Sequence, residues 1–507
     1  MIYTCKYFNF TPSNSPILRE LFKTYQEYAE EYEKTVEQDG FQGSIDPYTY
    51  VNGLISTWEK SWKENPSRFT YQPDPNKSTK KPNLDTIMDY VIKHFAAITF
   101  KDVIYIYDQK TGTYRPDEGE INGLIMDLLH SEGYTNNNKI AELFREIQTR
   151  IKARNIITKY PFNLVANLIP CKNGVLDPLT QTIVPRSPAY GFTYMINAEY
   201  LPEVDCIFIK KYLRTLVAPK DYEMLLNLGA SCLIRESQKK MYLIYNRSGN
   251  NGKTTLLNLL TDMLGKENTS SLSLQDFDKG GFRVAEIDGK IANISGDLPT
   301  TRISDTSVIK QLTGEDFIMI ERKYGQPYEI QNRAILIFGA NEPPVFNDTT
   351  DAFYSRMVMI EFPNQFKVDL DFNKKLKEPE NLSALLKVFV DHIPTLLKSG
   401  ITTDTEAMKN QYLRESDSVY RFFEDNLVKD QFGEIDLDLV YDVYIDYCTV
   451  NKVKKVGKKA FSVRMSEHFD VSTRRRGSTG EQIAYLKGVK FKSAKQQTFD
   501  QIEMTAA

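Results

Sequence analysis

The stretch Met241–Leu264, MYLIYNRSGNNGKTTLLNLLTDML, constrains the fold more than any other part of this chain. It begins with five largely apolar residues, which predict a buried strand, and it ends with leucine and methionine at helical spacing. The turn between the two elements is rich in glycine and asparagine, which accept positive φ at low cost. A buried strand that passes through a tight turn into a helix is typical of an α/β unit.

The turn has the residue types of a phosphate-binding loop. Such a loop presents backbone N–H groups to the anion and adds a lysine for the outer phosphates and a hydroxyl for Mg²⁺. Lys253 and Thr254 match these two roles, and the anion would face the N-terminus of the following helix. The expected nucleotide-binding residues are Gly249, Asn250, Asn251, Gly252, Lys253, Thr254 and Thr255.

One position departs from the usual pattern, because Arg247 stands where that pattern has its first glycine. The position lies where the chain leaves the strand, and the amides that would bind phosphate come after it. The departure is tolerable if Arg247 keeps a negative φ. The alternative is a glycine- and asparagine-rich surface turn before a helix.

Polar residues next to three further apolar segments extend the predicted site. Asp297 ends the apolar part of GKIANISGDLP and is the expected acid of a Mg²⁺ site. Asn341 ends RAILIFGAN, where a neutral amide can bond both the γ-phosphate and the attacking water. Arg356 precedes MVMIEF and can stabilise the charge that develops on a transferred phosphoryl group. Taken alone, Asp297 fits a strand-end turn equally well, and Arg356 fits a surface ion pair better.

Composition excludes several other classes of function. The formal net charge is −3, so a nucleic-acid partner would have to meet positive potential that is concentrated locally. The five cysteines and four histidines show no CxxC, H-x-H or HExxH spacing, which argues against a disulfide framework, a zinc ribbon and a histidine-metal nuclease. The sequence has no membrane span and no signal peptide, so we expect a protein of the host cell cytoplasm without a membrane partner.

The ordered set of GNNGKTT, ISGDLP, the stretch Ile309–Pro344 and DAFYSRMVMIEF resembles superfamily 3 helicases, most closely the phage, plasmid and poxvirus primase-helicase type. The resemblance covers about residues 85–490. It implies an α/β fold with an AAA+-like P-loop NTPase core, hydrolysis of ATP with Mg²⁺, assembly into a ring, expected to be a hexamer, and translocation on single-stranded DNA.

The resemblance also assigns roles by position in the motifs. Lys253 and Thr254 match the phosphate-loop pair, and Asp297 matches the second-motif acid, so Thr254 and Asp297 would hold the metal. Asn341 matches the sensor asparagine, and Arg356 a finger that acts on the nucleotide of a neighbouring subunit. Gly296 stands where many relatives have a second acid, which leaves the base that polarises water unidentified.

Two basic segments are candidates for DNA contact. The stretch Phe317–Ile330 reads as a hairpin with Arg322, Lys323 and Tyr324 near its tip, where the family has a DNA-tracking hairpin. Six copies of a basic tip would make a strong local field in an acidic particle. In the tail, two helical patterns and a hairpin with Arg474, Arg475 and Arg476 suggest a winged-helix-like module. The alternatives are a solvated turn and a solvated arginine face.

Composition and pattern divide the chain into seven parts. We expect a small N-terminal unit of unknown role over 1–65, a linker over 66–83, a mixed helical and α+β domain over 84–235, the ATPase core over 236–365, a helical connection over 366–404, a winged-helix-like domain over 405–492 and a tail over 493–507.

Three functions remain open. The leading hypothesis is a ring-forming replicative helicase of a mobile element, acting on single-stranded and forked DNA with primase or other replication proteins as partners. The second is an origin-binding initiator that uses ATP as an assembly switch. The third, primer synthesis, is disfavoured because the N-terminal unit is short and has no Asp-x-Asp or Asp-x-Glu metal pair.

Overall fold

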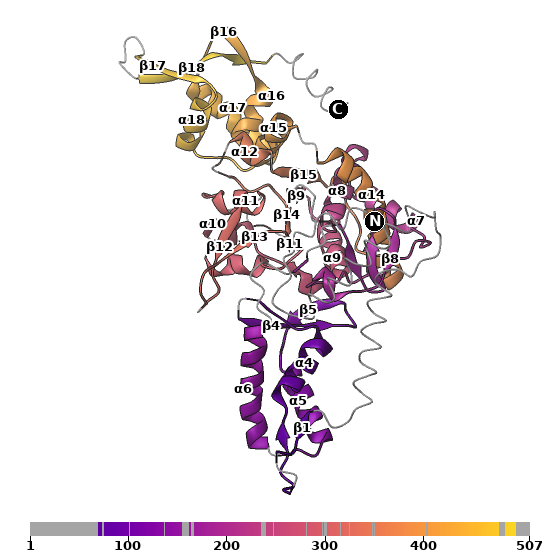
Figure 1. Ribbon diagram of the computed structural model, residues 1–507. Helices are drawn as coiled ribbons and strands as arrows, with labels where there is room; N and C mark the ends of the chain where they lie inside the picture. The colour runs from indigo at the N-terminus through magenta and orange to yellow at the C-terminus, as the bar shows by residue number, and fades with distance from the viewer. Residues whose placement is uncertain are drawn as a thin grey trace, which may run out of the picture.

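The structure, a computed structural model, describes residues 69–492 with gaps at 74–75, 101, 136, 155–161, 164–166, 235–239, 247, 280, 297, 299–301, 315, 324, 347, 349, 402–403 and 476–481. The expected N-terminal unit and the tail after 492 lie outside these residues. The described chain forms an N-terminal helical domain, a central domain around a parallel sheet, and a C-terminal domain (Figure 1). Among the described residues no helix is both long and apolar enough to cross a membrane.

The N-terminal domain packs three helices against a small antiparallel sheet. The first helix, α4 (Leu84–Phe95), coincides with its amphipathic pattern, and the Asn83 side chain caps it by accepting from Thr86 N. The apolar face of α4 packs with α5 (Glu120–Ser131) and α6 (Asn137–Arg154). The strands β3 (Ile98–Phe100), β4 (Val103–Asp108) and β5 (Thr113–Pro116) pair in that order, as the predicted hairpin requires.

The linker expected over residues 66–83 forms part of this domain where it is described. Strand β1 (Thr70–Tyr71) pairs antiparallel with β2 (Lys81–Pro82). Phe69 N and Thr70 Oγ1 donate to the Glu132 carboxylate at 2.8 and 2.5 Å, and Phe69 packs in the helical core. The proline-rich composition predicted a linker, but the contacts to Glu132 lie far away in sequence and left no local signal.

The residues between the N-terminal domain and the central sheet form strands and then helices, as predicted. An antiparallel sheet joins β6, β7 and β8, with Asn173-Gly174 and Asp177-Pro178 at its turns. The elements in this segment are β6 (Ile169–Cys171), β7 (Gly174–Asp177), β8 (Thr182–Val184), η1 (Pro188–Tyr190), α7 (Ile207–Leu216), η2 (Pro219–Asp221) and α8 (Tyr222–Ser231).

The packing divides the chain differently from the predicted boundaries. Residues of β6, α7 and α8 share one hydrophobic cluster with the central sheet and with α14 (Pro379–Ser399). The boundary expected near 235 therefore does not separate two packed units, and α14, expected to be a connection, is part of the central core. Local patterns predicted the helices but could not predict which face they cover.

The central sheet has five parallel strands in the order β10-β11-β14-β9-β15. Tyr245, at the carboxyl end of β9, is level with Ala340 in β14 and Glu361 in β15. The near-continuous apolar runs of these strands fit a sheet that is buried on both faces. Strands alternating with helices were predicted for 236–365, and the fold confirms this. The strands are β9 (Met241–Tyr245), β10 (Thr269–Ser270), β11 (Ala292–Ser295), β14 (Ile335–Ala340) and β15 (Met357–Glu361).

Helices cover both faces of this sheet (Figure 1). On one face Tyr242 and Ile244 of β9 pack with α7, α8, α9 and α14. On the other face Leu243 and Tyr245 pack with α10, α11, α12 and α15. The remaining helices of this domain are α9 (Lys253–Leu264), η3 (Lys266–Asn268), α10 (Leu274–Lys279), η4 (Phe282–Ile287), α11 (Ser307–Leu312), α12 (Asp351–Tyr354), α13 (Leu370–Leu376) and α15 (Thr405–Ser416).

The C-terminal domain combines helices with a three-stranded antiparallel sheet of order β16-β18-β17. The helices and the terminal hairpin were predicted, but β16 was not. Its register shifts between Lys429 and Glu434, so the apolar-polar alternation that marks a strand is interrupted. The elements are α16 (Ser418–Asn426), β16 (Leu427–Asp436), α17 (Leu437–Val450), α18 (Lys458–Ser466), β17 (Asp470–Arg475) and β18 (Gln482–Phe491).

Candidate functional site

The turn after β9 lies at a switch point of the sheet. The helix that follows β9 packs on one face, whereas the connections after β11 and β14 pack on the other. In open parallel sheets, ligands bind outside the carboxyl ends of the strands at such a point. Residues 246–252 and Asn341 follow the neighbouring strands β9 and β14 and therefore meet at this edge.

Lys253, the first residue of α9, is only 5% exposed and turns its ammonium toward the loop. Its Nζ donates to Asn246 O at 3.3 Å, to Asn251 Oδ1 at 3.0 Å and to Asn341 Oδ1 at 3.2 Å. These three acceptors are neutral, so the contacts hold the ammonium in place without cancelling its charge. One cation thus joins the loop, the helix and the end of β14.

Two loop residues have the left-handed backbone that their residue types favour. Asn250 has φ 58° and Gly252 has φ 82°. A Cβ at Gly252 would lie 2.7 Å from Leu216 Cδ2, so the packing beneath the loop also requires glycine. The carbonyl of Asn250 accepts from Phe366 N at 2.7 Å, which fixes the loop to the segment after β15.

Side-chain amides hold the rest of the loop. Asn246 Oδ1 accepts from Ser248 N at 2.7 Å, and Asn246 Nδ2 donates to Phe362 O at 2.6 Å. The buried Asn251 donates its Nδ2 to Ser248 O at 2.6 Å. Among the described residues, no side chain caps the N-terminus of α9. Backbone N–H groups of its first turn therefore remain available to an anion.

These features fit the phosphates of a nucleotide. The close approach at Gly252 allows no side chain, the uncapped helix end offers N–H groups, and Lys253 supplies a buried positive charge. Thr254 is exposed and Thr255 half-buried in the first turn of α9. The Thr254 hydroxyl is thus accessible to a metal ion bound beside the phosphates.

Two sequence-predicted positions at this edge, Arg247 and Asp297, lie outside the described residues. Near Asp297, Ser295 pairs with Phe338 at the end of β11, and Leu298 N donates to Gly339 O at 3.0 Å. The metal role of Asp297 stays a prediction.

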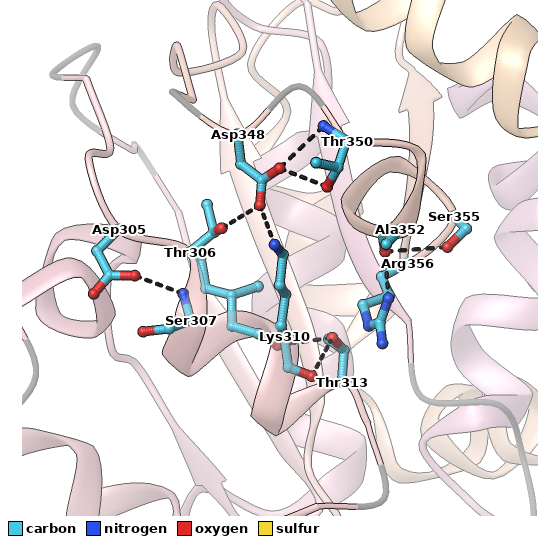
Figure 2. A network of polar contacts seen from close by, with 11 residues as sticks. Asp305, Thr306, Ser307, Lys310, Thr313, Asp348, Thr350, Ala352, Ser355 and Arg356 are labelled. Atoms are coloured by element: carbon cyan, nitrogen blue, oxygen red, sulfur yellow. Dashed lines mark hydrogen bonds and ion pairs between the residues drawn. The ribbon is translucent and has the colours of Figure 1, made fainter.

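Arg356 lies at the opposite edge of the sheet from the loop. It directly precedes β15, and Met241 N, at the start of β9, donates to Arg356 O at 2.7 Å. Its Nη1 donates to Ala352 O, while its buried Nε has no hydrogen-bond partner within the described chain (Figure 2). A strand of five residues separates the two edges by roughly 17 Å. The Arg356 side chain therefore does not belong to the loop of its own chain.

A second cation, Lys240, lies beside Arg356. Lys240 Nζ donates to Ser355 O at 2.5 Å. Burial lowers the pKa of Lys240, and the positive charge of Arg356 lowers it further. The sequence analysis did not single out Lys240, although its position just before β9, next to the start of β15 in a parallel sheet, could have indicated it.

The hairpin of β12 (Phe317–Ile320) and β13 (Tyr328–Gln331) forms as predicted and pairs Ile320 with Tyr328. Gly325 N donates to Arg322 O at 2.7 Å and closes a turn at the tip. Lys323 is exposed, and Tyr324 lies outside the described residues. Arg322 does not simply extend into solvent, because its Nη2 lies 3.6 Å from Asp288 Oδ2.

The predicted arginines of the tail are described only in part. Arg474 pairs with Ile483 and Arg475 with Gln482 in the β17-β18 ladder, so both lie at the end of that hairpin. Arg476 and the turn that follows it lie outside the described residues.

Metal-ligand chemistry other than that of the loop is not evident. Within the described ranges, no cluster of three or more His, Cys, Asp or Glu residues could hold a metal ion. The described cysteines, Cys171, Cys206, Cys232 and Cys448, are buried free thiols, as expected from their spacing.

Three family descriptions match successive segments of the chain. Residues 85–217 match "D5 N terminal like", residues 244–356 match a family of unknown function (DUF5906), and residues 414–503 match "Poxvirus D5 protein-like". The middle match contains the loop, Asn341 and Arg356, and ends at Arg356.

Comparison with individual proteins gives one viral relative and several solved structures. A protein of Acanthamoeba polyphaga mimivirus named "Putative helicase L207/L206" is 26% identical over 230 residues, which are 42% of this chain and 23% of that protein. The chain therefore spans less than a quarter of this relative. Two apo structures of the NrS-1 C-terminal region are 10% and 12% identical, each covering 79% of this chain and 98% of the other, with TM-scores of 0.42 and 0.43.

Proposed function

We propose that this chain, which belongs to the D5-like family of helicases and primases, is an ATP-driven helicase that forms a ring and moves along single-stranded DNA. Similarity to this family indicates a replication helicase or primase. The finer proposal depends above all on one observation, the contact of Lys253 with Asn341 at the carboxyl edge of the sheet. In this proposal the central domain is the AAA+-like core of a superfamily 3 helicase.

In the proposed reaction the loop binds the phosphates of ATP. The N–H groups at the start of α9 face the anion, and the Lys253 ammonium exchanges its amide oxygens for phosphate oxygens. That exchange is favourable because charge-assisted hydrogen bonds are stronger than those to neutral oxygens. A Mg²⁺ ion held by Thr254 and Asp297 would neutralise part of the phosphate charge.

Asn341 would complete the site on the side of β14. Its Oδ1 accepts from Lys253 in the described structure. When Lys253 turns toward phosphate, the Asn341 amide becomes available to orient the attacking water without adding negative charge. The base that polarises this water stays unassigned.

Arg356 would act on the nucleotide of a neighbouring copy of the chain. Its place at the amino edge of β15 supports this, because its side chain is far too short to span the sheet to its own loop. A ring places one edge of each subunit against the other edge of the next, so that each nucleotide lies between two chains. Lys240 would contribute a second positive charge to the same face.

Two parts of the chain would contact DNA. The β12-β13 hairpin presents the exposed Lys323 and the exposed backbone of its turn, and Asp288 partly neutralises Arg322. The tail combines helices α16–α18 with a three-stranded sheet, which is compatible with a winged-helix reader of nucleic acid. Arg474, Arg475 and Arg476 occupy the end of its hairpin.

The alternatives remain an origin-binding initiator that uses ATP as an assembly switch and a primase. The test uses the full chain with Mg²⁺ and ATP. A helicase hydrolyses ATP, is stimulated by single-stranded DNA and separates a forked duplex, and its particle mass rises to that of a ring. Binding of ATP with assembly but without strand separation would favour the initiator. Formation of dinucleotides from NTPs on a single-stranded template would favour the primase.

A further inference from the structure

Asp348, which the proposed reaction does not use, lies at the centre of a polar cluster between α11 and the segment after β14 (Figure 2). The Lys310 ammonium, from α11, contacts Asp348 Oδ2. Thr306 Oγ1, just before α11, donates to the same oxygen at 2.7 Å. Thr350 donates to Asp348 Oδ1 from its N at 3.0 Å and from its Oγ1 at 2.6 Å. Both carboxylate oxygens are therefore used.

The cluster is shielded from water, which makes its charge pairing matter. The side chains of Asp348 and Lys310 are 12% and 35% exposed, and Thr306 is buried. Burial by itself would raise the pKa of Asp348, but the bonds from Lys310, Thr350 and Thr306 outweigh this effect and hold the pKa well below its usual range. The carboxylate is thus ionised throughout the neutral range, and the ion pair is a fixed part of the fold.

On one side, the cluster is connected to the β12-β13 hairpin. Helix α11 ends at Leu312, and Leu312 O accepts from the buried Asn332 at 2.7 Å. Asn332 Oδ1 also accepts from Ala334 N at 3.0 Å, so it fixes the junction where the hairpin returns to β14. Strand β12 begins at Phe317, soon after α11. A shift of α11 would therefore move the base of the hairpin.

On the other side, the cluster is connected to both ends of the candidate nucleotide machinery. The segment that holds Asp348 starts at Asn341, which contacts Lys253, and ends at Thr350, the N-cap residue of α12. The carbonyl of Ala352 in α12 accepts from Arg356 Nη1. Asp348 is thus positioned between the residue that contacts the loop and the residue proposed to act on a neighbouring nucleotide.

The segment has few other ties, and those leave Asp348 as its polar link to α11. Ile303 N donates to Val345 O at 2.8 Å, and Phe346 N donates to Tyr412 Oη at 3.0 Å. These bonds connect the segment to the chain before α11 and to α15. Of the contacts described for this segment, those of Asp348 are the ones that reach α11 through a side-chain charge.

We propose that Asp348 is a positioning residue that couples the nucleotide site to the hairpin, by holding α11 through Lys310 and Thr306 against the segment that carries Asn341 and Arg356. This inference rests on the proposed function and deepens it. Asn341 moves when nucleotide replaces its contact with Lys253, and the segment transmits that movement to α11 and the hairpin base. In the reverse direction, DNA at the hairpin changes the position of Asn341 and with it the rate of hydrolysis.

The test compares ATP hydrolysis with and without single-stranded DNA in the full chain and its variants. Asp348→Asn should keep basal hydrolysis within about two-fold but lower the stimulation by single-stranded DNA about five-fold, an effect within the range of single residues between coupled sites. Lys310→Gln should do the same. The exchange of charges in Lys310→Asp with Asp348→Lys should restore part of the stimulation, which a purely local structural role would not do.

A matched control is the ion pair of Lys387 with Asp391 within α14, where the carboxylate is 32% exposed and Nζ lies 2.9 Å from Oδ1. Asp391→Asn should leave the stimulation unchanged. Thermal melting checks that each variant is folded, and Lys310→Met, which keeps the packing of the aliphatic chain, replaces Asp348→Asn if the latter does not fold.

Wild-type stimulation in the folded Asp348 and Lys310 variants would overturn the coupling, as would equal loss of basal and stimulated hydrolysis. A wild-type chain that hydrolyses ATP without any response to DNA would overturn it as well. These results differ from failure of the proposed function itself, in which the wild-type chain hydrolyses no ATP or Lys253→Ala hydrolyses it at the wild-type rate.

Discussion

Lys253 Nζ donates to Asn341 Oδ1 at 3.2 Å, across 88 residues of sequence. The contact exists because β9 and β14 are neighbours in a parallel sheet, so the residues after their carboxyl ends meet. It joins two residue types that have separate tasks in phosphoryl transfer, a cation for the phosphates and a neutral amide for the water. This pairing is the basis of the predictions for the nucleotide site.

Replacement of Lys253 by alanine should reduce ATP hydrolysis at least about a hundred-fold, as the loss of a preorganised donor to developing charge does in other enzymes. The measurement is phosphate release with Mg²⁺ and ATP, together with thermal melting. Because the Lys253 ammonium is buried beside neutral oxygens, its removal should not unfold the chain. Hydrolysis close to the wild-type rate in a folded variant would contradict the loop assignment.

Asn341→Ala should slow hydrolysis more than it weakens ATP binding. The Asn341 amide contacts the lysine rather than the loop backbone, so the phosphates keep most of their partners. We expect a loss of about ten-fold or more in kcat with a change in the ATP dissociation constant of less than about three-fold. Asn364→Ala, which removes a bond to Thr215 O outside the loop, is the control. Equal losses in binding and turnover would assign Asn341 to phosphate binding instead.

A mixing experiment tests whether Arg356 acts between subunits. Arg356→Ala and Lys253→Ala should each be inactive, but a 1:1 mixture should recover about a quarter of wild-type hydrolysis, because one interface in four then combines an intact loop with an intact arginine. The recovery should require subunit exchange before the assay. Two inactive variants that stay inactive after verified exchange would show that both residues are needed in the same chain.

Lys323→Ala should weaken binding of single-stranded DNA and reduce its salt dependence. Lys323 is exposed at the hairpin tip, so its contribution should be a phosphate contact. Loss of one phosphate contact per protomer lowers the slope of log affinity against log salt by about 0.7. Fluorescence anisotropy at several salt concentrations gives the slope. Lys374→Ala, at an exposed site on α13, should leave it unchanged, and a similar fall in that control would indicate a nonspecific charge effect.

The packing of α8 on α14 predicts a change in stability. A Cβ at Gly229 would lie 2.2 Å from a ring carbon of the fully buried Phe389, so Gly229→Ala should overpack the helix contact and cost about 1–3 kcal/mol. Gly123→Ala, in α5, meets no atom within 4 Å and should stabilise its helix by about 0.5–1 kcal/mol. Thermal melting of both variants distinguishes packing from helix propensity. A melting temperature that rises at both sites would show that the α8-α14 contact is loose.

The sequence by itself determined the elements whose signals are local. Met241–Leu264 specified strand, turn and helix through apolar runs, glycine and asparagine, and Phe317–Ile330 specified a hairpin. These patterns are legible because side-chain periodicity and backbone preference depend on neighbouring residues only. The residue types Lys253 and Asn341 were likewise predicted from their places beside apolar strands.

Only the tertiary structure decided which distant residues meet. It assigned α7, α8 and α14 to one face of the sheet, drew residues 69–83 into a domain through Glu132, and placed Arg356 at the edge opposite its own loop. It also paired Lys310 with Asp348, for which the sequence offers no spacing or motif. Such contacts depend on strand order and on the burial of side chains from separate elements, which no local pattern encodes.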